Sequence, residues 1–375
     1  MALTAVLLVA ASLLSQALTA GPVAVVLLAW VSVLAVGVAS GEGVPVVPAL
    51  WRFLAAFGAL AIAEWPFWGG SYRISNLLGT VAFLFLIPSI VVALSLSRPG
   101  VLRAMSQGVM AAFWLFSACV LVYGLGAGID LQRDMIFVPD MQKNGVGAIY
   151  ELLFLYTFGA ARGNVRTQLA ALLVACPALL VIGSKTALAL GLLFAIGMWA
   201  RWLFLVGAPA ALVSVIWEAL KFDYESSLRT AAFRLLTWQQ AWQEINASAR
   251  AFWLGNGPAA FIGRLPQFDQ PGTPGTHNII LQFWHGYGLV GLLLLAGFFF
   301  WVWRKFGFVG VPGIACFWLF NVHALFDVGW VNGPGFVASL VFGLGIAAQV
   351  EVSPAMLKVR AAVGPPPLAL GGRPS

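Results

Sequence analysis

The chain has 375 residues, of which 61% are hydrophobic and only 9% charged, and its mean hydropathy is +0.94. Soluble domains carry roughly 25% charged residues, so this composition excludes a soluble enzyme or binding module. The formal net charge of +7 does not indicate nucleic-acid binding, because lysine and arginine accumulate in the cytoplasmic loops of membrane proteins.

Apolar runs of about 20 residues recur along the chain, and each is long enough to cross a bilayer as a helix. We therefore predict an all-α polytopic membrane protein with about 12 transmembrane helices. In chain order the expected spans are 2–20, 22–40, 47–68, 75–97, 104–127, 144–161, 167–183, 186–200, 202–217, 277–303, 307–326 and 333–350.

The spans divide the chain into four parts. Residues 1–217 hold nine spans, 218–276 form one long loop, 277–350 hold three spans, and 351–375 form a tail that is predicted to be disordered. With a cytoplasmic N-terminus, the inner loops and the tail carry eleven lysines and arginines, against four in the short outer loops. Because short loops decide orientation, the long loop is expected on the extracytoplasmic side.

Residues 226–246 of this loop predict an amphipathic helix. Apolar side chains recur there at spacings of three or four residues: Leu228, Ala231, Leu235, Trp238, Trp242 and Ile245. The tryptophans suit the boundary between lipid and water. A Gly-Asn-Gly-Pro turn follows at 255–258, and a Pro/Gly-rich stretch at 271–275 leads into the next span.

His277 stands at the rim of the tenth span. At 100° per residue, a helix from 277 places His277, Trp284, Gly288 and Gly291 within a stripe of about 60°. The two glycines would let a neighbouring helix approach closely and fix where the histidine points. Histidine exchanges protons near neutral pH, which suits catalysis, although a rim histidine also binds carbonyls or lipid headgroups.

Three cations are candidate phosphate ligands. Arg234 has Trp238 one helical turn later, and arginine binds phosphate through two parallel hydrogen bonds. Arg229 lies five residues earlier, where contact with lipid phosphate is the favoured interpretation. Lys185 follows Gly183-Ser184 in a very short outer turn; it either snorkels to the surface or binds an anion at a helix start.

The remaining polar residues of the spans leave alternatives open. His285 is expected to be a buried packing histidine, and His323 with Asp327 is either a proton-relay pair or, more simply, a hydrogen-bonded pair. Glu64 and Glu151 are candidates for a proton pathway, a substrate contact or a structural pair. No cluster has the spacing of metal ligands.

Three ordered motifs resemble those of bacterial O-antigen ligases and their relatives. His277-Asn278-x9-Gly288-x2-Gly291 is similar to the family signature His-[Asn/Ser/Gln]-x9-Gly-x2-[Gly/Thr/Tyr], and Leu281 and Gln282 fit its wider form His-Asn-x-x-Leu-Gln. Arg234 and Trp238 resemble the family's Arg-x-x-x-Trp. The segment from Leu254 to Phe261 resembles Leu-Gly-x-Gly-Pro-x-x-Phe.

The resemblance implies a membrane glycosyltransferase with a GT-C-like fold in the bacterial inner membrane. Its active site would face the periplasm, its donor would be a glycan on undecaprenyl diphosphate, and its acceptor would be lipid A–core or a growing glycan. Membrane lipids are implied partners, nucleic acid is not, and no metal or other cofactor is needed. Arg234, helped by Lys185 and Arg229, would hold the diphosphate, and His277 would activate the acceptor hydroxyl or contact phosphate.

Two positions depart from the family pattern. Lys185 stands where arginine is common, which puts two-fold hydrogen bonding to phosphate in doubt, and Gly286 stands where glutamate is common. A ligase ranks above a repeat-unit polymerase, because polymerases are expected to have a second large outer loop and 128–143 is short. Protein glycosylation ranks third.

Two other classes of protein remain alternatives. A transporter or lipid-linked glycan flippase would place charges deep in several spans and interrupt helices at matched positions in two halves. Glu64, Glu151 and the region of Asp327 give it thin support. A non-catalytic scaffold gives no reason for His277 and Arg234 to cluster.

Overall fold

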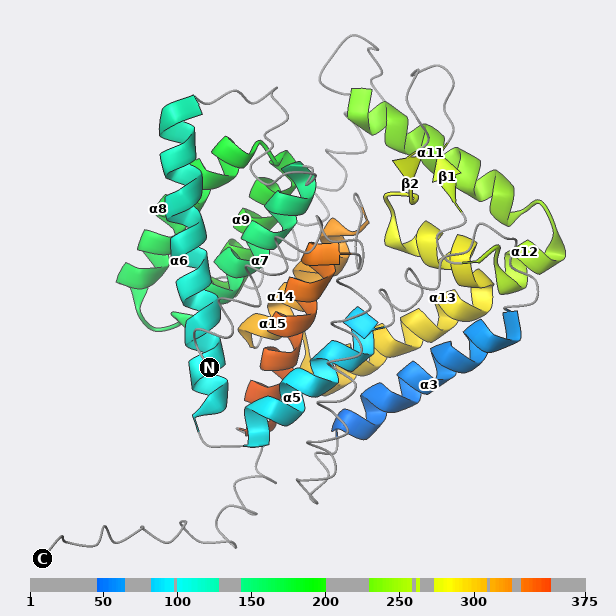
Figure 1. Cartoon of the computed structure of the whole chain (residues 1–375), viewed down its shortest axis with the longest axis horizontal. Coiled ribbons are helices and arrows are strands. Elements are labelled where there is room, and N and C mark those ends of the chain that lie inside the picture. The colour runs from blue at the N-terminus through cyan, green and yellow to red at the C-terminus, as the bar shows by residue number, and fades with distance from the viewer. Residues whose placement is uncertain are drawn as a thin grey trace, which may run out of the picture.

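The computed structural model describes residues 46–64, 82–97, 100–127, 143–199, 229–257, 261–263, 273–308, 311–325 and 332–351. These residues are almost entirely helical (Figure 1). The helices are α3 Val46–Glu64, η3 Ala82–Leu86, α5 Ile87–Ser97, α6 Val101–Ala127, α7 Lys143–Ala160, α8 Val165–Ile182, α9 Lys185–Trp199, α11 Arg229–Ile245, α12 Ala249–Leu254, α13 Ile279–Phe306, α14 Pro312–His323 and α15 Asn332–Glu351. Two short strands, β1 Ile262–Gly263 and β2 Thr273–Pro274, pair antiparallel.

Nine of the twelve predicted spans coincide with described helices, and the other three, 2–20, 22–40 and 202–217, lie outside the described residues. Among the described helices, α6, α8, α13 and α15 are each long and apolar enough to cross a membrane. This finding fits a polytopic membrane protein. The number of twelve spans and the GT-C-like architecture stay predictions, and the tail after 351 lies outside the described part.

The centre of the helical bundle is formed by α7, α14 and α15. Phe317 of α14 stacks on Phe342 of α15, with ring centroids 4.2 Å apart, and both rings are fully buried. His323 Nδ1 of α14 lies 2.6 Å from Glu151 Oε1 of α7, and neither residue is exposed. The suggested partner of His323, Asp327, lies outside the described residues, and Glu151 makes the bond. Of the three roles considered for Glu151, the structural pair is the one with a visible partner.

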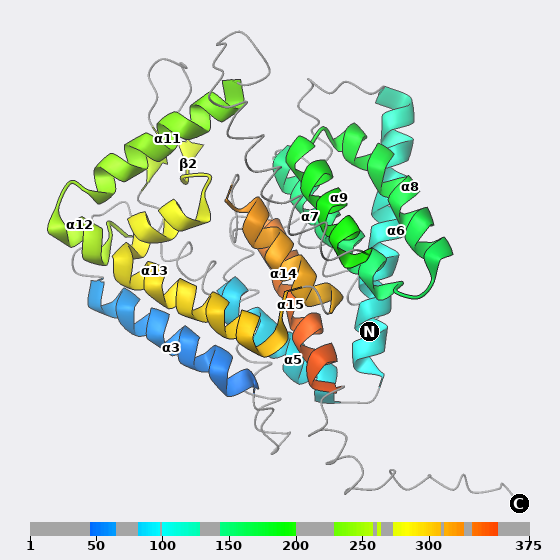
Figure 2. The same cartoon turned by 180° about the vertical axis from the view of Figure 1, so that it is seen from behind.

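The expected amphipathic helix is α11, which is described from Arg229 to Ile245; residues 226–228 lie outside the described part. Its buried positions are Thr237, Ala241 and Ile245, whereas Trp242 is 47% exposed. Of the predicted apolar stripe, Ile245 is buried, Leu235 and Trp238 are half-buried, and Trp242, although partly exposed, packs edge-on against Trp284 of α13. The packed face also includes Thr237 and Ala241, which the stripe did not contain. Figures 1 and 2 show α11 and α12 together at one side of the molecule, beside α13.

Candidate functional site

The helix that follows His277 is broken in its first third. α13 begins at Ile279, and Gly288 within it has non-helical dihedral angles, φ 64° and ψ −173°. Such angles are accessible almost only to glycine. The expectation of one continuous stripe through His277, Trp284, Gly288 and Gly291 is wrong, because the break turns Gly291 away towards Tyr287 and Leu60.

The partner that requires glycine at 288 is the end of α12. A Cβ atom at 288 would overlap the backbone of Trp253 and Leu254. Gly255, with φ 81° and ψ −178°, makes the reciprocal approach, since a Cβ there would lie 2.6 Å from the carbonyl oxygen of Gly286. Two of the three motifs found in the sequence therefore meet backbone to backbone.

This contact also satisfies the carbonyl groups that the break exposes. Asn256 N donates to His285 O at 2.7 Å, and Gly257 N donates to Gly286 O at 3.1 Å. Buried backbone groups need such partners, so the Leu-Gly-Asn-Gly turn serves as the cap of the first segment of α13. We name this segment, 279–287, the entry segment.

Hydrogen bonds also fix the first residues of the entry segment. Asn278 caps the helix: its Oδ1 accepts from the backbone N of Ile280 and Leu281 at 3.0 and 3.1 Å. Its Nδ2 donates to Leu325 O at 3.0 Å, just after α14. The backbone N of Ile279 donates to Ala324 O at 2.7 Å. These bonds fix the first residues of α13 against α14 and give Asn278 its place in the motif.

His277 occupies a strained backbone position directly before this cap. Its φ is 51°, and it is the only non-glycine residue with positive φ in the part of the chain that the structure describes. Its side chain is half-buried. The preceding residue, Thr276, is held in place because its Oγ1 donates to Asn278 O at 2.8 Å. Strain of this kind costs about 1–3 kcal/mol and tends to persist at functional sites.

Arg234 is on the same face of α11 as the buried Ala241 and Ile245, each of which is about 20° from it around the helix. Glu244 of α11 bonds to His285 of α13, and at 100° per residue Arg234 is only about 80° around the helix from Glu244. Both views show α11 and the entry segment running in the same direction, with β2 near their starts (Figures 1 and 2). Arg234 and His277 thus belong to the same end of this helix pair.

Comparison with known protein families gives a match to part of the chain. The model of the family described as O-antigen ligase matches residues 152–296. The chain carries an O-antigen ligase-like domain. This likeness supports a membrane glycosyltransferase-type enzyme of the ligase or polymerase kind. No curated protein matches the chain.

Within the ligase-like domain, the other predicted site residues fall on helix starts and turns. Trp238 lies one turn after Arg234, and its indole Nε1 is buried with no hydrogen-bond partner among the described residues. Gln282 is in the entry segment, half-buried beside Gly275. Arg229 is the first residue of α11 and Lys185 the first of α9. Whether these two cations approach Arg234 stays a prediction.

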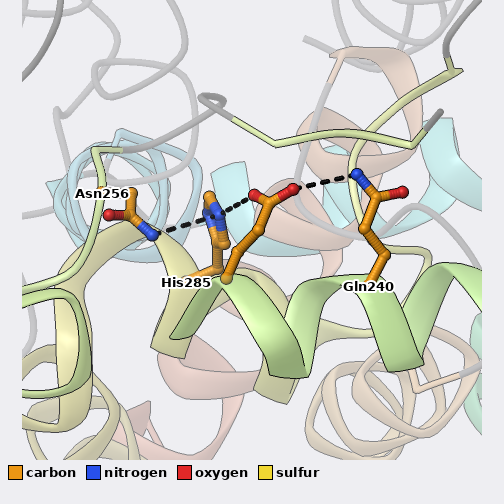
Figure 3. A network of polar contacts seen from close by, with 4 residues as sticks. Gln240, Asn256 and His285 are labelled. Carbon is orange, nitrogen blue, oxygen red and sulfur yellow. Dashed lines mark hydrogen bonds and ion pairs between the residues drawn. The ribbon is translucent and has the colours of Figure 1, made fainter. Parts of the chain in front are cut away.

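A polar network that the sequence did not predict ties the ligase-like domain together (Figure 3). His285 Nε2 lies 2.8 Å from Glu244 Oε2, and Gln240 Nε2 donates to Glu244 Oε1 at 2.9 Å. Asn256 Nδ2 is 3.4 Å from the same histidine nitrogen, and the ring of Phe261 packs edge-on against the imidazole. His285 is buried, as expected, but it also has a charged partner. Only the i, i+4 spacing of Gln240 and Glu244 is visible in the sequence.

A second buried polar pair, His323 and Glu151, lies outside the ligase-like domain. No group of three histidine, cysteine, aspartate or glutamate residues that could hold a metal ion occurs among the described residues. Glu64 is the last residue of α3.

Proposed function

We propose that this chain transfers a glycan from undecaprenyl diphosphate to an acceptor at the periplasmic face of the bacterial inner membrane, with lipid A–core as the favoured acceptor. The observation that supports the proposal is that the segments with the other two motifs, α11 and the turn after α12, both contact the entry segment inside the ligase-like domain. These contacts leave His277, with its strained backbone, and Arg234 at the same end of two paired helices.

The depth of the site supports a lipid-borne donor. After its break, α13 continues from 289 to 306, a rise of about 27 Å, which is close to the roughly 30 Å of a bilayer's hydrocarbon core. Exposed Trp303, Arg304 and Lys305 mark one boundary. The break and α12, with Trp253 52% exposed, then lie at the other boundary. The phosphates of a polyprenyl diphosphate sit at the same level, since their tail stays in the hydrocarbon.

The chemistry follows from these groups. The guanidinium of Arg234 binds the diphosphate oxygens, with Lys185 and Arg229 adding positive charge. The acceptor oxygen bonds to the anomeric carbon while the bond from that carbon to the diphosphate oxygen breaks. His277 takes the acceptor proton, and undecaprenyl diphosphate leaves with the negative charge. Removing one such charge-stabilising donor typically costs about 3 kcal/mol.

The proposal is tested in proteoliposomes that contain undecaprenyl-diphosphate-linked polymer and lipid A–core. We expect Arg234→Ala and His277→Ala each to lower transfer by roughly 100-fold, and Arg234→Lys to recover only part, because lysine lacks the planar fork. Arg103→Ala, at an exposed arginine of α6, is the matched control. Undiminished transfer by well-expressed Arg234→Ala and His277→Ala proteins contradicts the proposal.

The same variants separate a ligase from a polymerase in cells. Loss of a ligase leaves long polymer on undecaprenyl diphosphate and none on lipid A–core. Single repeat units in place of long chains instead indicate a polymerase and contradict the proposed acceptor. The side of the membrane is tested with a membrane-impermeant acceptor, which we expect to be glycosylated by right-side-out vesicles and not by inverted ones.

A further inference from the structure

We propose that Glu244 and His285 are positioning residues whose hydrogen bond fixes Arg234 relative to His277. The inference rests on the proposed function, because it assigns the bond a purpose at that site. In this proposal neither Glu244 nor His285 contacts the donor or the acceptor.

The hydrogen bond between His285 and Glu244 has a defined direction, and both partners are held in place. A carboxylate only accepts hydrogen bonds, so His285 Nε2 donates to Glu244 Oε2 over 2.8 Å. His285 is only 2% exposed, and Glu244 is held from its other oxygen by Gln240 at 2.9 Å. Figure 3 shows these side chains in one line with Asn256, which comes from the turn that caps the entry segment. The bond between Glu244 and His285 therefore joins α11 to the entry segment, and the backbone bond from Asn256 N to His285 O joins the entry segment to the turn after α12.

Apolar packing alone fixes the two helices less well. The packed face of α11 consists of Thr237, Ala241 and Ile245, and Trp242 beside it packs edge-on against Trp284 of the entry segment, with ring centroids 5.3 Å apart. Burial of such side chains is favourable over a range of helix angles because the hydrophobic effect has no direction. A hydrogen bond prefers a narrow range of distance and angle. Glu244 and His285 thus narrow the range of helix angles that the apolar and ring contacts allow.

The bond between Glu244 and His285 is far from Arg234 along α11, so a small change of helix angle at the bond moves Arg234 by a large distance. Arg234 precedes Glu244 by ten residues, or about 15 Å of helix, and α11 and the entry segment run in the same direction from their starts (Figure 1). A tilt of α11 by about 20° around the bond would move the backbone of Arg234 by about 5 Å. Displacements of even 1 Å can cost about 100-fold in rate. Loss of the bond is therefore expected to lower the rate of transfer by more than the loss of one hydrogen bond would by itself.

The test compares Glu244→Gln with Glu244→Ala in the proteoliposome assay. Glutamine keeps an oxygen that accepts from His285, so we expect it to stay within about threefold of the wild type, whereas alanine lowers kcat/KM for the lipid-linked donor at least tenfold. The acceptor KM should stay within about twofold. Gln243→Ala, on the exposed face of the same helix, is the control. Combining Glu244→Ala with His285→Ala should add little to Glu244→Ala alone, because both remove one bond.

A distance measurement gives a readout that activity does not. Spin labels at two exposed positions, Gln239 of α11 and Ile280 of the entry segment, should show a broader distance distribution in Glu244→Ala than in the wild type or Glu244→Gln.

Three results overturn the inference. The first is full activity of Glu244→Ala, and the second is an unchanged distance distribution. In the third, Glu244→Gln is as inactive as Glu244→Ala, which would assign the carboxylate charge a direct role. Arg234→Ala and His277→Ala, measured alongside, separate the two proposals: if they stay active, the proposed function fails, and if only Glu244→Ala stays active, the positioning role alone fails.

Discussion

Replacing Gly288 by alanine should uncouple α12 from α13. The residue has φ 64° and ψ −173°, where a non-glycine residue is strained by about 1–3 kcal/mol. The added Cβ would also overlap the backbone of Trp253 and Leu254, and overpacking costs about 1–3 kcal/mol more. The two effects sum to about 2–6 kcal/mol. Because backbone atoms cannot rotate away as a side chain can, the contact itself must open.

The matched control is Gly297→Ala in the same helix. No atom lies within 4 Å of a Cβ at 297, and alanine there should stabilise the helix by up to about 1 kcal/mol. We expect Gly288→Ala to lower glycan transfer per folded protein at least tenfold, since about 2 kcal/mol corresponds to roughly 30-fold, and to lower the melting temperature in detergent. Equal activity and equal melting temperature for the two variants would refute this account of the break.

Two further substitutions probe the surroundings of the site. Gly147→Ala places a Cβ against the side chain of Ser184, an overpacking that costs about 1–3 kcal/mol. We expect the turn before Lys185 to shift and the KM for the donor to rise. The control is Gly126→Ala, which has no atom within 4 Å of the added Cβ and should leave the donor KM unchanged. Asn278→Ala removes a helix cap worth about 1 kcal/mol and the bond to the end of α14. The melting temperature should fall more than for Asn278→Asp, which keeps the capping oxygen.

The sequence predicted the positions of the helices, because these depend on the length and average polarity of each segment. Nine expected spans coincide with described helices, and the loop helix ends within one residue of its predicted end. The break at Gly288 was missed, because a single glycine inside a helical pattern is ordinarily tolerated. What distinguishes Gly288 is the backbone of Trp253 against it, and periodicity carries no information on that contact.

The polar pairs were missed for a related reason. His323 and Glu151 are 172 residues apart, and His285 and Glu244 are 41 apart. Spacing rules relate neighbours on one helix, so they suggest Asp327, one turn away and outside the described residues, and not Glu151. The Glu151 contact depends on how α7 packs against α14, and a composition-based prediction of helices does not contain that packing.

The nine-residue interval in the His-Asn-x9-Gly motif has a mechanical explanation. The entry segment spans nine residues, or about 13 Å, between two fixed ends: Asn278 and Ile279 bonded to the end of α14, and Gly288 against α12. One residue more or fewer would rotate one end by about 100° and move it by about 1.5 Å. Either the cap or the break would lose its partner, and His277 would lose its defined direction. The interval therefore measures the separation of α12 and the end of α14, which explains why the spacing is as much a part of the motif as the residues.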